Sequence, residues 1–180
     1  SSADLPRIGF VDAFEDDTIA RARAGFLKAL ADGGYSEQQG TLELIYRNAQ
    51  GDIPTLTQIV NYFISQDVLL IGASPTLATI TAVQRAREIP VFMMVSPTAA
   101  LMGLTDENGN APANLLGTGE ELDYIDTSFA MIQNLLPAEG RSLRIGLLYN
   151  QSEPQSVSSY ERLNKLAVDK GVELIAKAVN

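Results

Sequence analysis

Apolar strand-like runs alternate with amphipathic segments along the chain. Residues 8–11 are short, apolar and β-prone, and residues 68–71 are continuously apolar, as expected for a central parallel strand buried on both faces. The intervening segments repeat apolar residues at helical spacing, most clearly in the series Leu122, Ile125, Phe129, Ile132 and Leu136. This alternation predicts an α/β fold with Rossmann-like parallel sheets flanked by helices.

Turn and cap residues set the expected ends of these elements. Gly33-Gly34 should end the first helix, Asp52 should cap the second, and Pro137 with Gly140 should end the helix described above. The expected strands are 7–12, 42–46, 68–72, 91–95, 115–116, 144–149 and 172–179, and two further helices are expected at 76–88 and 157–170. Residues 117–121 lie between a short strand and a helix, so we expect an N-terminal lobe of residues 1–118 and a second lobe of residues 119–180.

Three of the expected strands run into short, mostly polar tips that are each followed by a helix. The tips are residues 13–17, 73–76 and 150–156. Ligands of open α/β sheets bind at the carboxyl ends of the strands, where such tips collect. Hydroxyl groups and backbone N–H groups at a helix N-terminus suit a small anionic or zwitterionic group. The tips therefore predict small-molecule binding.

Composition narrows the possible functions. The 180 residues are 46% hydrophobic and 19% charged, enough to build one large domain or two small lobes. A net charge of −9 without a basic run excludes a nucleic-acid partner and disfavours binding to an anionic membrane surface. The absence of Cys and His removes the usual nucleophile pairs and the His and thiolate metal sites. Because Ser1 is not an initiator Met, we expect a processed or trimmed chain, from which an export signal has been removed.

Other chemistries fit single features but lack a second motif. The turn 106–110 alternates Asp and Asn as a calcium loop does, but Ala111 and Gly117 stand where that loop needs Gly and Glu. No dinucleotide fingerprint follows the first strand, so no cofactor is expected. Asp12 superficially fits a phospho-acceptor, but the acidic pair and the lysine that such a site needs are not located. Paired carboxylates would fit a hydrolase, but no second motif supports one. We expect neither a catalytic residue nor a metal site.

Several tip residues have both a structural and a functional interpretation. Ser74-Pro75-Thr76 suits a carboxylate ligand and also suits a helix start, as does the tip 150–156. Asn150-Gln151-Ser152 in addition fits a glycosylation acceptor. Phe14 could stack on a ligand ring or pack between lobes, and Tyr149 fits a core or hinge position.

Several strings of residues resemble the ABC-transporter substrate-binding protein family that includes the tryptophan- and tyrosine-binding lipoproteins. The strings are Ala49-Gln50-Gly51-Asp52, Ala73-Ser74-Pro75-Thr76, Leu135-Leu136-Pro137, Arg144–Asn150 and, most specifically, Tyr149-Asn150-Gln151-Ser152-Glu153-Pro154-Gln155-Ser156-Val157. The resemblance covers nearly the whole chain. It implies a type I periplasmic-binding-protein fold, in which two lobes close on a small ligand.

The same resemblance implies the function and the site. The chain would be a non-enzymatic, extracytoplasmic solute-binding protein of an ABC importer, periplasmic or held as a lipoprotein on the outer face of the membrane. It would bind an amino acid, aromatic in most known members, between the two lobes and deliver it to a permease. The implied ligand-binding residues, together with Phe14, are Glu15, Ser74, Pro75, Thr76, Ser96, Pro97, Thr98, Asn150, Ser152, Glu153, Gln155 and Ser156. The implied hinge is Gly117, Thr118, Gly119 and Glu120.

The chain departs from the family pattern at three places. Asp16-Asp17 replaces a His-Pro pair, Ser96-Pro97-Thr98 lacks the family's Asp, and 116–119 differs from the usual hinge string. If the missing Asp pairs with a ligand ammonium group, this protein needs another carboxylate or another ligand.

The second lobe has fewer elements than the family pattern. It comprises a helix, a strand, a helix and a strand, so we expect an incomplete lobe with exposed edges that favours self-association. An alternative function with the same fold is the ligand-binding input domain of a sensor, which signals through a partner or a dimer.

Overall fold

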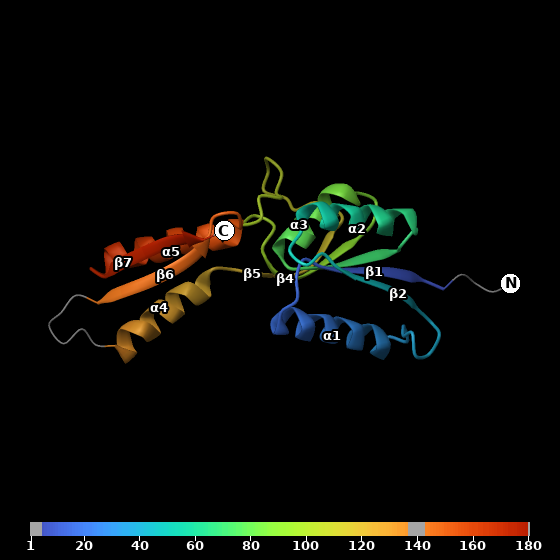
Figure 1. Cartoon of the computed structure of the whole chain (residues 1–180), viewed down its shortest axis with the longest axis horizontal. Helices are drawn as coiled ribbons and strands as arrows, with labels where there is room; N and C mark the ends of the chain where they lie inside the picture. The colour runs from blue at the N-terminus through green and yellow to red at the C-terminus, as the bar shows by residue number, and fades with distance from the viewer. Residues whose placement is uncertain (1–4, 137–142, 180) are drawn as a thin grey trace. The chain divides into compact units, whose positions relative to one another are not determined.

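The computed structural model describes residues 5–136 and 143–179 (Figure 1). The chain divides into two compact units, Ser1–Glu120 and Glu121–Asn180. The expectations for Ser1, Pro137 and Gly140 fall outside the described residues. Each unit is an α/β arrangement with parallel strands, as the sequence predicts.

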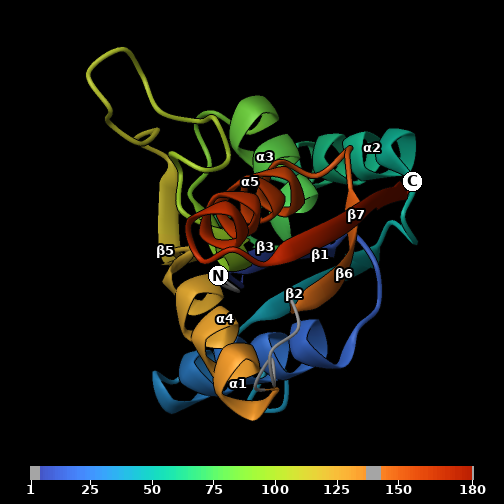
Figure 2. The same ribbon diagram turned by 90° about the vertical axis from the view of Figure 1, so that its left-hand side faces the viewer.

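The first unit is built on a five-stranded parallel sheet with the order β2-β1-β3-β4-β5. Its strands are β1 (Arg7–Asp12), β2 (Glu43–Asn48), β3 (Leu70–Ser74), β4 (Val91–Pro97) and β5 (Leu115–Glu120). Its helices are α1 (Asp17–Asp32), α2 (Ile53–Ser65) and α3 (Thr76–Arg85). Helix α1 covers one face of the sheet, and α2 and α3 cover the other, as both views show (Figures 1 and 2).

Two glycines in the central strands let phenyl rings lie directly on the sheet. A Cβ atom on Gly72 would lie 2.6 Å from the ring of Phe10, and one on Gly9 would lie 2.7 Å from the ring of Phe63. Both phenyl rings are fully buried. On the α1 face, Phe10 packs against Phe26 with ring centroids 5.6 Å apart. These contacts set the spacing between the sheet and its helices on both faces.

In the first unit, strands β2 to β5 and helix α3 differ from the predicted bounds by up to four residues; β2 and β3 each end two residues later than predicted, at Asn48 and Ser74. Strand β4 extends through Ser96 and Pro97, and β5 includes the expected hinge residues 117–120. These strand ends were not predicted because their residues are polar or glycine and have little β-propensity of their own. Pairing between β4 and β5 holds them in an extended conformation. Helix α3 ends at Arg85 rather than near residue 88, and the Asn114 side chain donates hydrogen bonds to the carbonyl oxygens of Val83 and Ala86 at this end.

The second unit consists of α4 (Asp123–Leu135), β6 (Arg144–Asn150), α5 (Pro154–Asp169) and β7 (Glu173–Val179). Strands β6 and β7 pair in parallel, α5 packs on both, and α4 packs on α5. Helix α5 begins at Pro154 instead of the expected residue 157, because proline is well tolerated in the first helical turn. The side chain of Arg162 on α5 pairs with Asp126 and, at 2.8 Å, with Asp123, both on α4.

Large apolar side chains remain exposed on the second unit. Leu135 and Val168 are each 72% exposed, and Leu148 is 71% exposed. Exposed apolar surface of this kind favours association. Self-association of the chain stays a prediction.

A bulge in β4 requires a glycine in β5. The β4–β5 register shifts between Met93 and Ser96, and Val95 has a positive φ of 52°. Opposite the bulge, Gly117 has a φ of 119°, and a Cβ atom there would lie 2.3 Å from the carbonyl oxygen of Met93. A side chain at position 117 therefore meets both an unfavourable backbone conformation and a backbone atom that cannot rotate away.

We expect Gly117→Ala to lower the free energy of unfolding by about 2–4 kcal/mol, because it combines backbone strain with a steric overlap. Urea denaturation followed by circular dichroism measures this change. The matched control is Gly146→Ala in β6, where an added Cβ meets no atom within 4 Å and should leave stability unchanged or slightly raised. Equal effects of the two substitutions would contradict this explanation.

Candidate functional site

Polar side chains collect at the carboxyl edge of the first unit's sheet. Strand β1 ends at Asp12, which pairs in register with Asn48 at the end of β2 and with Ser74 at the end of β3. Register partners in a parallel sheet point to the same face, so these three side chains share the face covered by α1. This is the edge at which ligands of parallel α/β sheets bind.

A buried carboxylate lies at the centre of this edge. The side chain of Asp12 is 0% exposed and forms an ion pair with Arg23 of α1, which is 20% exposed. The Tyr46 hydroxyl donates a hydrogen bond of 3.0 Å to Asp12 Oδ2, and Arg23 Nη1 lies 2.9 Å from that hydroxyl. The guanidinium also lies over the Tyr46 ring, 4.4 Å from its centroid. Three elements therefore meet at one carboxylate.

The burial of this cluster changes its acid–base properties. Burial raises the pKa of the Asp12 carboxyl above its ordinary value, and the opposing effects of Arg23 and the Tyr46 hydroxyl only partly offset it. Burial also raises the pKa of the Tyr46 phenol. For Arg23, burial lowers the pKa, but Asp12, Tyr46 and Glu15 together raise it more, so this cation stays charged. The negative charge of Asp12 is thus stabilised by a single cation among the described residues, the guanidinium of Arg23.

Glu15 extends the cluster to the surface. Its side chain is 64% exposed, with Oε1 3.5 Å from Arg23 Nη2. Its other oxygen accepts a hydrogen bond of 3.2 Å from Asn48 Nδ2 and lies 3.4 Å from the Tyr46 hydroxyl. An open hollow of about 450 Å³ lies here, lined by Phe14, Glu15, Tyr46, Asn48 and Gln50. The structure brings Phe14 and Glu15 together at this hollow.

The second predicted tip lies at the N-terminus of α3. Pro75 is the N-cap residue, and no side chain caps the helix. The N–H groups of a first helical turn have no partner within the helix, so they suit a carboxylate. Thr76 begins the helix and is 6% exposed, and Ser74 is fully buried just before it.

The implied ligand-binding residues at the end of β4 are mostly internal. Ser96 is 1% exposed, and its hydroxyl lies 3.0 Å from that of Thr79 in α3. Pro97 is also fully buried, whereas Thr98 is partly exposed. The Ser96 hydroxyl therefore already has a partner that links β4 to α3. Its polarity has a structural explanation that the sequence did not reveal.

The third predicted tip, residues 150–156, belongs to the second unit. The Asn150 N–H donates to Ser156 Oγ at 2.9 Å, and the Ser152 N–H donates to Asn150 Oδ1 at 2.8 Å. A hollow of about 240 Å³ is lined by Tyr124, Leu147, Leu148, Tyr149, Glu153, Gln155, Ser156, Ser159 and Tyr160. The rings of Tyr149 and Tyr160 stack with centroids 4.5 Å apart. This unit thus brings three of the predicted residues beside aromatic rings.

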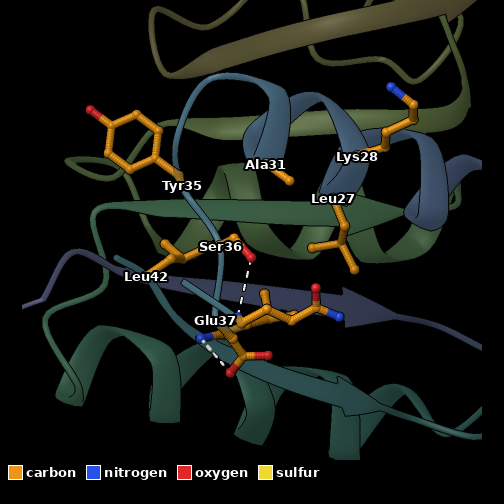
Figure 3. Close-up of a pocket in the computed structure, with 9 residues that line it drawn as sticks. Leu27, Lys28, Ala31, Tyr35, Ser36, Glu37 and Leu42 are labelled. Atoms are coloured by element: carbon orange, nitrogen blue, oxygen red, sulfur yellow. Dashed lines mark hydrogen bonds between the residues drawn. The ribbon is translucent and has the colours of Figure 1, made fainter. Parts of the chain in front are cut away.

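A different hollow lies at the opposite end of β2 (Figure 3). Leu27 of α1 and Leu42 before β2 line it, with Glu37 at its rim. Its two charged side chains already have partners, since Glu37 Oε1 accepts the Leu44 N–H at 3.2 Å and Lys28 pairs with Asp32 at 2.5 Å. This hollow lies away from the carboxyl edge, where ligands of parallel α/β sheets bind.

Neither a metal site nor a membrane span is found in residues 5–136 and 143–179. No three His, Cys, Asp or Glu side chains in these ranges converge on a point that could hold a metal ion. No helix in them is both long and apolar enough to cross a bilayer. In the turn 106–110, Asp106 Oδ1 accepts the N–H groups of Asn108 and Asn110, so this carboxylate closes its own turn.

Four residues of the cluster are absent from the predicted site, namely Asp12, Arg23, Tyr46 and Asn48. Asp12 was noted only as a superficial phospho-acceptor. Tyr46 and Asn48 alternate along β2, so their shared face was readable once β2 was aligned beside β1. Arg23 carried no signal of its own, because a cation on a helix usually faces solvent.

Comparisons with known proteins agree with this architecture. A family model described as "ABC transporter substrate binding protein" matches residues 7–180. The tyrosine-binding protein of Clostridioides difficile is 29% identical over 173 residues, which cover 96% of this chain and 49% of that protein. The chain therefore spans about half the length of this relative.

Two solved structures have the same fold. A conserved domain protein from Vibrio cholerae has a TM-score of 0.87 at 22% identity, over 98% of this chain and 58% of that one. The ABC domain from Streptococcus pneumoniae in complex with L-Trp has a TM-score of 0.81 at 18% identity, with the same coverage of 98% and 58%. The predicted α/β fold of the type I periplasmic-binding-protein kind is confirmed.

We expect Arg23→Met to lower the free energy of unfolding by about 3 kcal/mol near pH 8, because it leaves Asp12 buried without its cation. The loss should be smaller near pH 5. A raised folded-state pKa gives stability that is present at low pH and lost as pH rises through that pKa, and removing Arg23 raises the pKa of Asp12 further.

Urea denaturation at both pH values measures the difference. Arg21→Met, on the exposed side of α1, is the matched control and should have little effect at either pH. A loss that is the same at pH 5 and pH 8 would contradict the assignment to Asp12.

Proposed function

The chain belongs to the ABC transporter substrate-binding protein family, and from this we propose that it is the solute-binding protein of an importer whose ligand is an amino acid. The observation that carries the proposal is the carboxyl edge of the first sheet. An uncapped helix N-terminus, a hollow with an aromatic side chain and an acidic cluster occur there together. These are the groups that a carboxylate, an apolar side chain and an ammonium group would each need.

The relatives support an amino acid as the ligand. One is described as a tyrosine-binding protein, and another was solved in complex with L-Trp. The hollow at the carboxyl edge of the first sheet is lined in part by Phe14, which is 38% exposed and so has ring surface available to a ligand. The tip residues Asn150, Ser152, Glu153, Gln155 and Ser156 remain predicted ligand contacts of the second unit, and the predicted hinge at 117–120 remains a proposal.

Membership of the family also supports a cellular role. We expect the protein to act outside the cytoplasmic membrane, in the periplasm or anchored as a lipoprotein, and to deliver its ligand to a membrane permease. Binding would change the balance between conformations, and this balance would signal the loaded state to the permease. Fractionation of cells with an antibody to this protein tests the location.

We expect amino acids, and aromatic ones first, to raise the midpoint of thermal unfolding of the intact protein. A ligand that binds only the native state should stabilise it by about 2.7 kcal/mol at a hundredfold excess over its Kd. A panel of the amino acids and of small carboxylates lacking an amino group provides the measurement. No shift with any compound would refute the proposed ligand class.

Substitutions should identify which hollow is used. We expect Phe14→Ala to weaken ligand binding about tenfold, because an aromatic contact contributes about 1–1.5 kcal/mol beyond simple burial. The matched control is Tyr35→Ala, which removes an exposed ring from the hollow of Figure 3. Isothermal titration with the amino acid that gives the largest thermal shift compares them. If Tyr35→Ala weakened binding more than Phe14→Ala does, the ligand would bind in the hollow at the start of β2, which would contradict the proposal.

A further inference from the structure

Two buried oxygen atoms at the carboxyl edge have no hydrogen-bond partner among the residues that the structure describes. They are Asp12 Oδ1 and Ser74 Oγ, and both side chains are 0% exposed. The two residues are register partners on β1 and β3, so they stand side by side on the α1 face, about 4.8 Å apart along the sheet. Buried polar atoms nearly always have a partner, and an isolated exception calls for a specific explanation.

The charges around these atoms leave a negative excess. Asp12 and Glu15 contribute two carboxylates, and both pair with the single guanidinium of Arg23. Arg23 binds Asp12 through Oδ2, the oxygen that also accepts from Tyr46, so it leaves Oδ1 unused. A group that adds one positive charge and donates hydrogen bonds would complete the cluster.

The N-terminus of α3, which suits an anion, follows directly after Ser74 in the chain. Helix α3 begins two residues after Ser74, and its first turn has no side-chain cap. The N-terminus of such a helix attracts a carboxylate. In an α-amino acid, the ammonium and carboxylate groups are attached to the same carbon atom. A ligand with its carboxylate at α3 would therefore hold its ammonium group close to the ends of β1 and β3.

We propose that Asp12 Oδ1 and Ser74 Oγ accept the ammonium group of the ligand, so that this edge selects α-amino acids over carboxylates that lack an amino group. The inference rests on the proposed function and assigns its specificity to Ser74, which is one of the predicted ligand-binding residues, and to Asp12, which is not. It also answers the question raised by Ser96-Pro97-Thr98, which lacks the family's Asp: the carboxylate is supplied by the end of β1 instead.

Asp12 suits this role better than Glu15 does. Glu15 is 64% exposed, so its attraction for a cation is screened by water, and Asn48 already donates to one of its oxygens. Asp12 is buried, where a charge-assisted hydrogen bond is stronger. The side chains that contact Asp12 are those of Arg23 and Tyr46, and both are partly exposed. Entry of the ammonium group requires one of them to move.

The test compares each aromatic amino acid with its des-amino analogue in isothermal titrations of the intact protein. The pairs are L-Tyr with 3-(4-hydroxyphenyl)propionate, L-Trp with indole-3-propionate and L-Phe with 3-phenylpropionate. We expect the wild type to prefer the amino acid. Asp12→Asn should weaken amino-acid binding by about tenfold to hundredfold, the range of a charged hydrogen bond, and should leave binding of the analogue within about threefold.

A second variant keeps the test decisive if Asp12→Asn does not fold. Ser74→Ala removes a buried hydroxyl that has no partner, so it should fold as well as the wild type and still reduce the preference for the amino acid several-fold. Asp17→Asn is the matched control, because it removes a carboxylate from the exposed first turn of α1 and should leave the preference unchanged.

The outcomes separate the inference from the proposed function. If the wild type binds neither member of any pair and no other amino acid shifts its thermal unfolding, both are refuted. If it binds the analogue as tightly as the amino acid, solute binding stands but the inference is overturned. The inference is also overturned if Ser74→Ala and a folded Asp12→Asn keep the full preference, or if Glu15→Gln loses it while they keep it.

Discussion

The burial of the Asp12 carboxylate is the constraint on which the carboxyl edge of the first sheet depends. A carboxylate without solvent needs a cation and hydrogen-bond donors, and here they come from α1 and β2. These contacts link α1 to the sheet and hold the Tyr46 hydroxyl beside Asp12. One buried charge at the end of a central strand thus connects three elements at the candidate site.

Much of the fold could be predicted from sequence because its strands are apolar runs and its helices are amphipathic. The alternation of the two gave the parallel α/β class and nearly every element of both units. The extensions of β4 through Pro97 and of β5 through Glu120 could not be read in this way. They depend on pairing with a neighbouring strand around a bulge, whereas propensity describes each segment alone.

The candidate site was less predictable than the fold. Polarity at strand ends located Phe14, Glu15 and Ser74, because tips of this kind are local in sequence. It also selected Ser96, whose hydroxyl instead bonds to Thr79 inside the first unit. Arg23 and Tyr46 reach Asp12 from other elements, and only the strand register and the position of α1 bring them together. Contacts of this kind are set by tertiary packing, which a single sequence does not encode locally.

The rings that lie on Gly9 and Gly72 have an evolutionary consequence. Phe63 and Phe10 occupy the volume that any larger residue at these two positions would need, on opposite faces of adjoining strands. Neither glycine can therefore be replaced alone without displacing a helix or a ring. Homologous chains should keep the pairs 9 with 63 and 10 with 72 or exchange both members together, so that these positions covary while the surrounding core drifts more freely.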